Sequence, residues 1–275
     1  MSMEILISGL ALSAITLLPL AMKWELEKRV AIPTACLIGI LSGAAASAIV
    51  VFWDLAFYQI VVLEICLITA MAMSLLLWRF YRDPERVCSE DENAVLSPAD
   101  GEIIYVKKIE DGEIPFSEKN GRRFPLNEFV QSDVVPQTGH LVGIAMNFLD
   151  VHVNRAPIGG RIRLLKHIKG LFISLKREEA VVQNERALTV IDNGHFKIGI
   201  VQIASRLVRK IVPYIQEGQE IQRGERIGVI RFGSQVDLIL PDLPSLLIKV
   251  NPGEKVEAGL SIVASLGKNE GEELF

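Results

Sequence analysis

The sequence predicts transmembrane helices at the N-terminus, followed by a mainly β (α+β) domain. Half of the 275 residues are hydrophobic and the mean hydropathy is +0.33, and almost all of the apolar excess lies before Trp78. From Arg79 onward, short alternating or β-branched stretches are separated by Gly, Pro, Asn and Asp, which is typical of compact β-rich domains. We therefore expect a membrane anchor over residues 1–78, a globular domain over residues 79–266 and a flexible tail over residues 267–275.

The predicted anchor consists of three apolar runs, over residues 5–22, 31–53 and 55–78. Each run approaches or exceeds the roughly 20 residues that a helix needs to cross a bilayer. The chain starts with Met-Ser-Met-Glu, which lacks the basic region of a signal peptide. The sequence leaves open whether the first run spans the membrane or lies in its interface, so we expect two or three spans.

Basic residues predict the orientation of the anchor. Segment 23–29 carries three of them, and Arg79, Arg82 and Arg86 follow the third run. If all three runs span, both basic segments lie on one side, which the positive-inside rule makes cytoplasmic. We therefore expect a protein of the cell membrane whose second domain faces the cytoplasm. Glu64 lies inside the third run, and we expect it to pack near a helix end or against a neighbouring helix.

In the second domain the pattern predicts one short helix, over residues 126–131, and a series of strands. Clear examples of the strands cover residues 101–106, 141–146, 188–191 and 196–203.

Two late segments, residues 217–228 and 251–260, each have the pattern of turn, short strand, glycine turn and short strand. They resemble the hammerhead strands of the barrel-sandwich fold found in biotinyl and lipoyl carriers. Lys249 has a strand-like context without the Met-Lys-Met or Asp-Lys-Ala flanks of a carrier lysine. The sequence therefore predicts the sandwich strands but not the carrier function.

Charge and cysteine content argue against a nucleic-acid partner and against a metal site or disulfides built from cysteine. The formal net charge is −4 and no basic cluster is present, which argues against nucleic acid. Cys36, Cys66 and Cys88 lack metal-ligand spacing, so we expect neither a metal site nor a disulfide framework.

Loops of the β-rich part carry the residue types of a nucleophile with its base. Gly233-Ser234 precedes an apolar strand, Asp100 lies in Ser-Pro-Ala-Asp-Gly, and His152 lies in the segment 147–157. A serine can be activated by a histidine that a carboxylate orients. Each motif alone is compatible with an ordinary turn, and it is their combination that indicates chemistry.

These motifs occur in the order found in a known family. They are Tyr-Arg-Asp-Pro-Glu-Arg (81–86), Ser-Pro-Ala-Asp-Gly (97–101), Asp-Val-His-Val-Asn-Arg-Ala-Pro (150–157), Asn-Glu-Arg (184–186) and the long motif 224–241 around Gly-Ser. Together they resemble the short-form phosphatidylserine decarboxylases, including the archaetidylserine decarboxylase-like proteins. The resemblance covers roughly residues 31–266, so the first apolar run is an addition to the usual two-helix anchor.

The resemblance implies an enzyme that makes its own cofactor. Ser234 would attack the carbonyl of Gly233 and cleave the chain into residues 1–233 and 234–275, which remain partners. Ser234 would become a pyruvoyl group, whose ketone forms a Schiff base with the substrate amine and accepts electrons as CO2 leaves. The implied reaction converts the serine headgroup of phosphatidylserine or archaetidylserine to ethanolamine, with a membrane phospholipid as substrate.

The resemblance also implies roles for individual residues. His152 is the expected base for self-cleavage and a source of protons, and Asp100 is its expected carboxylate partner. Longer members have a second histidine at the position of Arg155, so the division of these roles is left open. Arg155 and Arg231 are candidate phosphate contacts, because arginine suits bidentate binding of phosphate.

Two other functions compete with this one. A non-enzymatic membrane adaptor or carrier would explain the anchor and the sandwich, and a pyruvoyl enzyme for a soluble amino acid would not need the anchor. The sequence leaves open the hydrocarbon part of the lipid and the oligomeric state, including a homo-oligomer.

Overall fold

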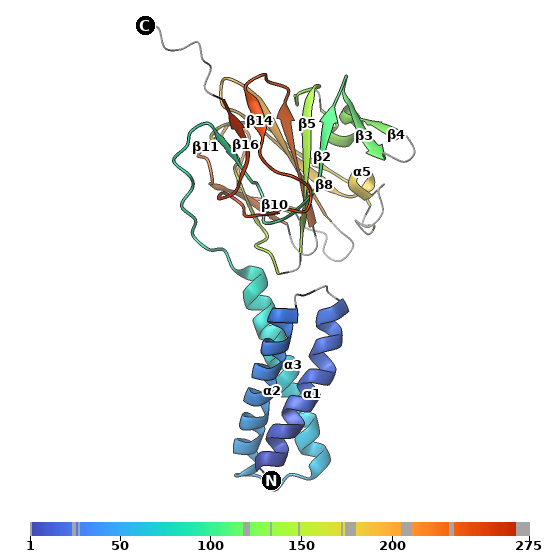
Figure 1. The fold of residues 1–275 in the computed structure, drawn as a ribbon, viewed down its shortest axis with the longest axis vertical. Helices are drawn as coiled ribbons and strands as arrows, with labels where there is room; N and C mark the ends of the chain where they lie inside the picture. The colour runs from blue at the N-terminus through green and yellow to red at the C-terminus, as the bar shows by residue number, and fades with distance from the viewer. Residues whose placement is uncertain are drawn as a thin grey trace. The chain divides into compact units, whose positions relative to one another are not determined.

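The computed structural model describes residues 2–23, 26, 28–117, 122–132, 134–147, 149–171, 173, 180–204, 211–230 and 234–267. The chain divides into two compact units, Met1–Phe80 and Tyr81–Phe275 (Figure 1).

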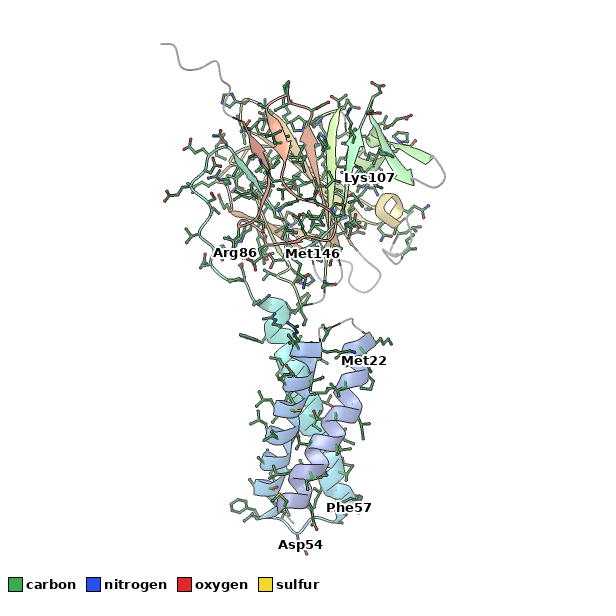
Figure 2. All side chains as sticks on the ribbon, in the orientation of Figure 1. Met22, Asp54, Phe57, Arg86, Lys107 and Met146 are labelled. Atoms are coloured by element: carbon green, nitrogen blue, oxygen red, sulfur yellow. The ribbon has the colours of Figure 1, made fainter. Side chains whose placement is uncertain are left out.

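The first unit consists of the helices α1 (Ser2–Lys23), α2 (Lys28–Val50) and α3 (Phe57–Tyr81). All three are long and apolar enough to cross a membrane. Many of their large apolar side chains are exposed, as a lipid environment requires; examples are Ile7, Leu37 and Val62. Figure 2 shows Asp54 and Phe57 at one end of the helices and Met22 at the other. The prediction of three apolar N-terminal helices is confirmed.

Small residues bring α1 and α2 into close contact. A Cβ atom on Gly9 would lie 2.7 Å from the carbonyl oxygen of Gly39, and one on Gly43 would lie 3.0 Å from that of Ile5. Close approach of backbones through small residues is a common way to pack helices in lipid. Ser8 Oγ donates a hydrogen bond of 2.6 Å to Oε2 of the buried Glu64, which joins α1 to α3.

The second unit is mostly β. Its strands are β1 (Ala94–Leu96), β2 (Gly101–Ile109), β3 (Glu113–Ser117), β4 (Arg122–Pro125), β5 (Gly139–Met146), β6 (Val153–Arg155), β7 (Gly160–Ile168), β8 (Arg186–Asp192), β9 (Lys197–Ile203), β10 (Ile211–Pro213), β11 (Glu220–Ile221), β12 (Arg226–Ile230), β13 (Ser234–Pro241), β14 (Leu246–Ile248), β15 (Lys255–Val256) and β16 (Ile262–Leu266). Two short helices, α4 (Leu126–Val130) and α5 (Ala180–Gln183), accompany them.

The largest sheet has the order β11-β7-β8-β9-β13-β5-β2-β15 and is curled (Figure 1). Two three-stranded sheets, β1-β16-β14 and β10-β12-β6, and the pair β3-β4 complete the unit. The central strand β13 contributes to cores on both faces of the sheet. Val236, Leu238 and Leu240 belong to one core, and Ile239 belongs to the other. Burial on both faces explains why this strand is almost continuously apolar in sequence.

The two hammerhead-like segments form as predicted. The first contains β11 and β12, and the second contains β15 and leads into β16. Gly224 (φ 79°) and Gly259 (φ 72°) occupy the turns in the left-handed region that favours glycine. The prediction of a mainly β domain with such strands is confirmed, whereas residues 268–275 of the expected tail lie outside the described residues.

Candidate active site

His152 lies directly before β6 and is 1% exposed. Its Nδ1 lies 2.8 Å from the backbone oxygen of Asp150. Because a carbonyl oxygen only accepts hydrogen bonds, this contact places the proton on Nδ1 and makes Nε2 the basic nitrogen. Burial lowers the pKa of His152, while the hydrogen bond to Asp150 and the charge of Asp100 raise it. The imidazole is therefore in its neutral, basic form near pH 7.

Asp100 precedes β2 and is buried beside the segment that carries His152. Its carboxylate accepts two hydrogen bonds from Arg86, of 2.6 Å to Oδ1 and 2.9 Å to Oδ2. Backbone N–H groups of Val151 (3.4 Å) and Ala258 (2.8 Å) also donate to it. Asp100 thus fixes the backbone next to His152 and adds a negative charge close to the imidazole.

Asp150 is a second carboxylate near His152 that the sequence reasoning did not assign. Burial raises its pKa, and the charge of Asp100 raises it further. The N–H of Asn147 donates to its Oδ2 at 2.6 Å, which closes the loop before His152. Its position inside the histidine motif was the available signal, but the sequence offered no way to choose between two aspartates.

Gly233 of the expected cleavage site and Arg231, a candidate phosphate contact, lie outside the described residues. Ser234 is the first residue of β13, where its backbone pairs with Met146 at the end of β5. On the other side of the gap, the N–H of Ile230 donates to the backbone oxygen of His152 at 3.2 Å. Ile230 and Ser234, the described residues next to this gap, therefore contact His152 and Met146. This pairing brings the backbone of Ser234 and that of His152 to the same edge of the fold.

A buried amide pair lies close to this edge. Gln202 Nε2 donates to Asn154 Oδ1 at 2.8 Å, and Asn154 Nδ2 lies 3.9 Å from the sulfur of Met146. Asn154 comes from β6 and Gln202 from β9, so the pair links two sheets. Sequence reasoning assigned no role to either residue. A lone glutamine within the apolar strand 196–203 was the only signal for Gln202.

Arg155 is buried and makes contacts of a structural kind. Nη1 donates to the oxygen of Gly224 at 3.0 Å, and Nη2 donates to the oxygen of Pro84 at 2.9 Å and to Asp83 Oδ1 at 3.3 Å. A Cβ atom on Gly259 would lie 2.9 Å from Cδ of Arg155. The side chain thus fills the space between the two hammerhead turns, and both terminal nitrogens are already engaged. The expected phosphate contact would require these bonds to break.

The Asn-Glu-Arg motif also has a structural place. Arg186 is buried and donates to the backbone oxygens of Phe129 (2.6 Å), Asn184 (2.9 Å) and Glu128 (3.1 Å). Burial lowers its pKa to about 10. The motif therefore ties α4 to the sheet.

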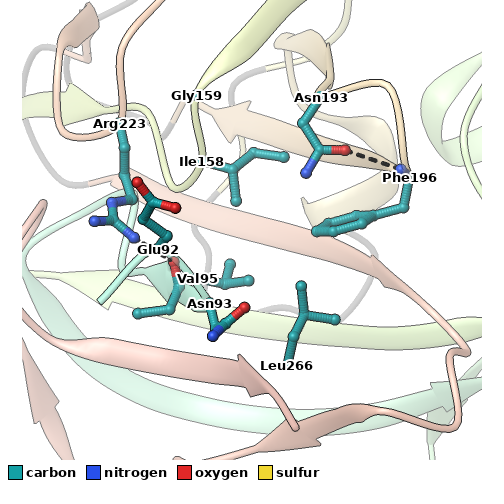
Figure 3. A pocket seen from close by; sticks show the side chains of 10 residues that line it. Glu92, Asn93, Val95, Ile158, Gly159, Asn193, Phe196, Arg223 and Leu266 are labelled. Atoms are coloured by element: carbon teal, nitrogen blue, oxygen red, sulfur yellow. Dashed lines mark hydrogen bonds between the residues drawn. The ribbon is translucent and has the colours of Figure 1, made fainter. Parts of the chain in front are cut away.

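A cavity of about 300 Å³ lies elsewhere in the second unit (Figure 3). Its lining includes Glu92, Ile158, Asn193 and Arg223, and it shares no lining residue with the cluster around His152. Arg223 already donates to the backbone oxygens of Ser89, Asp91 and Ala94. In the described part of the chain, no group of three His, Cys, Asp or Glu residues is arranged to hold a metal ion. We therefore centre the candidate site on His152.

The chain is similar to a known protein family and to several named relatives. The family model described as phosphatidylserine decarboxylase matches residues 73–264. A protein of Methanocaldococcus jannaschii, provisionally named an archaetidylserine decarboxylase proenzyme, is 45% identical over 185 residues, covering 67% of this chain and 87% of the relative. A protein of Methanothermobacter thermautotrophicus with the same provisional name is 38% identical, covering 68% and 78%. The phosphatidylserine decarboxylase proenzyme of Erythrobacter litoralis is 34% identical over 242 residues, covering 82% and 84%.

Proposed function

This chain belongs to the phosphatidylserine decarboxylase family, and from that premise we propose that it decarboxylates the serine headgroup of a membrane phospholipid. The proposal includes self-cleavage between Gly233 and Ser234, which converts Ser234 into a pyruvoyl group. The observation that carries it is a pair of backbone contacts, one on each side of residues 231–233: Ser234 pairs with Met146, and the N–H of Ile230 donates to the backbone oxygen of His152.

Self-cleavage needs a base at the serine hydroxyl, and His152 suits that task. Its Nε2 accepts the proton while the hydroxyl oxygen of Ser234 attacks the carbonyl carbon of Gly233. The peptide C–N bond breaks, the nitrogen of residue 234 takes the proton from His152, and an ester forms. Loss of the α-proton of residue 234 then expels the carboxylate of Gly233, which ends the chain 1–233. The dehydroalanine that is left takes up water and releases ammonia, and the pyruvoyl group begins the chain 234–275.

The pyruvoyl group supplies an electron sink for the bond that loses CO2. Residues of the chain itself transfer the proton and hold the site in place. His152 returns a proton to the carbon that loses the carboxyl group, and Asp100 and Asp150 keep the loop around His152 in place. Arg155 is engaged by Asp83, Pro84 and Gly224, so the position of the second family histidine offers no proton here. We therefore assign both proton transfers to His152, and Arg231 stays our candidate for the lipid phosphate.

The two products of cleavage would remain one molecule. Residues 234–275 contribute β13, β14, β15 and β16. Strand β13 pairs with β5 and β9, β15 pairs with β2, and β16 pairs with β1. These strands lie within sheets of the larger chain, so we propose a heterodimer that does not separate. The three apolar helices, which are long enough to cross a bilayer, support a location on the membrane that holds the substrate, and the basic residues support the cytoplasmic side.

The test is intact-mass spectrometry of the purified chain beside its Ser234→Ala and Ser245→Ala variants. We expect the wild type and Ser245→Ala to yield residues 1–233 and a small chain with a pyruvoyl N-terminus, and Ser234→Ala to stay whole. Ester-linked phosphatidylserine and its ether-linked analogue are then supplied in vesicles, and release of CO2 is measured for each. A folded wild-type chain that stays uncleaved would favour the non-enzymatic adaptor, and decarboxylation by uncleaved Ser234→Ala would exclude the pyruvoyl mechanism.

A further inference from the structure

A buried polar cluster lies in an otherwise apolar core, immediately after the proposed cleavage site. It consists of Tyr105 on β2 and of Gln235 and Asp237 on β13. Asp237 is fully buried and Gln235 is 3% exposed. They share a face of β13 with Ile239, which belongs to the core that also contains Leu141 and Val201.

The three side chains satisfy one another in a closed set of hydrogen bonds. Gln235 Nε2 donates to Asp237 Oδ1 and to the Tyr105 hydroxyl, both at 2.7 Å. The Tyr105 hydroxyl donates to Asp237 Oδ2, also at 2.7 Å. Both hydrogens of the amide and the hydroxyl hydrogen are thus used, and an ionised carboxylate is the acceptor that this arrangement requires. Lys107 Nζ lies 4.5 Å from the centre of the Tyr105 ring and adds a positive charge.

The sheet has two local features that let Tyr105 reach Asp237. Strand β5 lies between β2 and β13, and its Gly143 pairs with both Tyr105 and Asp237. A Cβ atom on Gly143 would lie 2.4 Å from the ring of Tyr105, so the ring occupies the space that a side chain would fill. The register of β2 also shifts between Ile103 and Tyr105. A glycine and an irregularity in register therefore allow a hydrogen bond across an intervening strand.

The cluster places a carboxylate in the core, and burial of a charge costs desolvation free energy that an apolar side chain would not. Burial raises the pKa of Asp237 to about 6, against the hydrogen bonds from Gln235 and Tyr105 and the charge of Lys107, which lower it. Apolar residues of similar volume commonly give equal or greater stability than a buried charge. A buried charge that does not improve stability is a common mark of a functional constraint.

We propose that Tyr105, Gln235 and Asp237 form a clamp that fixes the first residues of the small chain, and hence the pyruvoyl group, after self-cleavage. This inference rests on the proposed function. Before cleavage, β13 is covalently connected to the rest of the chain at both of its ends. Afterwards residue 234 is a free end, and Gln235 is the first residue whose side chain can hold it. Tyr105 comes from the large chain, so the clamp joins the two chains within one residue of the reacting group. All three are positioning residues.

The test compares Tyr105→Phe and Asp237→Asn with Ile239→Val in the full-length chain. Ile239→Val changes the same face of β13 without touching the clamp, and so controls for a loss of core packing. For each variant, intact mass gives the extent of cleavage, assays on phosphatidylserine vesicles give kcat and KM, and hydrogen exchange reports on the peptide that starts at residue 235. We expect complete cleavage in all three variants. In the two clamp variants, kcat should fall by about tenfold or more, KM should stay within about twofold, and exchange near residue 235 should rise, since small misplacements of reacting groups cost large factors in rate.

The outcomes separate the clamp from the proposed function. A cleaved and active wild type whose two clamp variants keep wild-type kcat and exchange overturns the clamp alone. The clamp is also overturned if Ile239→Val lowers kcat as much as Tyr105→Phe does. A folded wild type that is neither cleaved nor active overturns the proposed function, and the clamp with it.

Discussion

At the scale of single residues, the protonation state of His152 decides whether it can act as the base of the proposed self-cleavage. The hydrogen bond from Nδ1 to Asp150 leaves Nε2 as the base, and burial lowers the pKa of the imidazole. Self-cleavage requires the neutral form, which predominates above the pKa. The rate should therefore rise with pH to a plateau, and the lowered pKa should place the half-maximal rate below pH 6.5.

This prediction can be checked on precursor made by cell-free synthesis at a series of pH values, with the cleaved fraction followed over time. His167→Gln is the matched control, because His167 is half-exposed and contacts Glu185 on the surface. The control should keep the wild-type profile, whereas His152→Ala should slow cleavage at every pH. A half-maximal rate above pH 7 would contradict the assignment of His152 as the base.

Candidate site residues could be identified from motifs in the sequence, but the groups that they contact in the folded chain could not. His152 and Asp100 stood out because each lies in a motif that resembles those of the phosphatidylserine decarboxylases. The clamp did not, because Tyr105 and Asp237 are 132 positions apart and meet only through the register of β2, β5 and β13. The contacts of Arg155 could not be predicted for the same reason. Asp83 and Gly224, which it contacts, are distant in sequence, so the sequence did not reveal that Arg155 is buried.

At the scale of elements, the segment after α3 is tied into the β domain by a buried ion pair. The side chains of Arg86 and Asp100 are 7% and 8% exposed. Removal of one partner leaves a buried charge without compensation, so Arg86→Met should lower the free energy of unfolding of the domain by about 3–5 kcal/mol. Because Asp100 also holds the Val151 amide, self-cleavage should slow as well.

The control for this variant is Arg163→Met. Arg163 is half-exposed and pairs with Asp192 at 3.0 Å, and exposed pairs contribute about 0–1 kcal/mol. Denaturant titration, monitored by the circular dichroism signal of the β-sheets, gives the free energy of unfolding of each variant. Equal losses of unfolding free energy in the two variants would show that the Arg86–Asp100 pair contributes no more to stability than the exposed pair does.

In the helical unit, the contact between α1 and α2 depends on glycine. Gly9→Val would place a side chain against the Gly39 backbone, where a Cβ atom alone lies 2.7 Å from the carbonyl oxygen. We expect a lower midpoint for thermal loss of helical circular dichroism in detergent. Ala11→Val, on an exposed position of the same helix, should leave the midpoint unchanged. A similar midpoint in both variants would mean that α1 does not pack through Gly9.

At the scale of the whole molecule, the two-part organisation followed directly from composition. Apolar runs and β-type alternation are properties of adjacent residues, so the helices and most long strands were predictable. The pairing of strands was not, because contacts such as β13 with β5 join residues about ninety positions apart. The hammerhead segments were an exception, since their turns need glycine at fixed spacing, as at Gly224 and Gly259.

The proposed membrane anchor and the proposed lipid substrate together predict where the reaction can occur. A domain tethered to a bilayer meets the headgroups of that bilayer at a high effective concentration, and those of other vesicles only by collision. The full-length enzyme should therefore decarboxylate phosphatidylserine in its own proteoliposomes much faster than the same lipid in separate vesicles. The measurement mixes enzyme-containing vesicles without phosphatidylserine with enzyme-free vesicles that contain it, at matched total lipid. Equal rates in the two arrangements would mean that the substrate leaves the bilayer to react, and the apolar helices would then need another explanation.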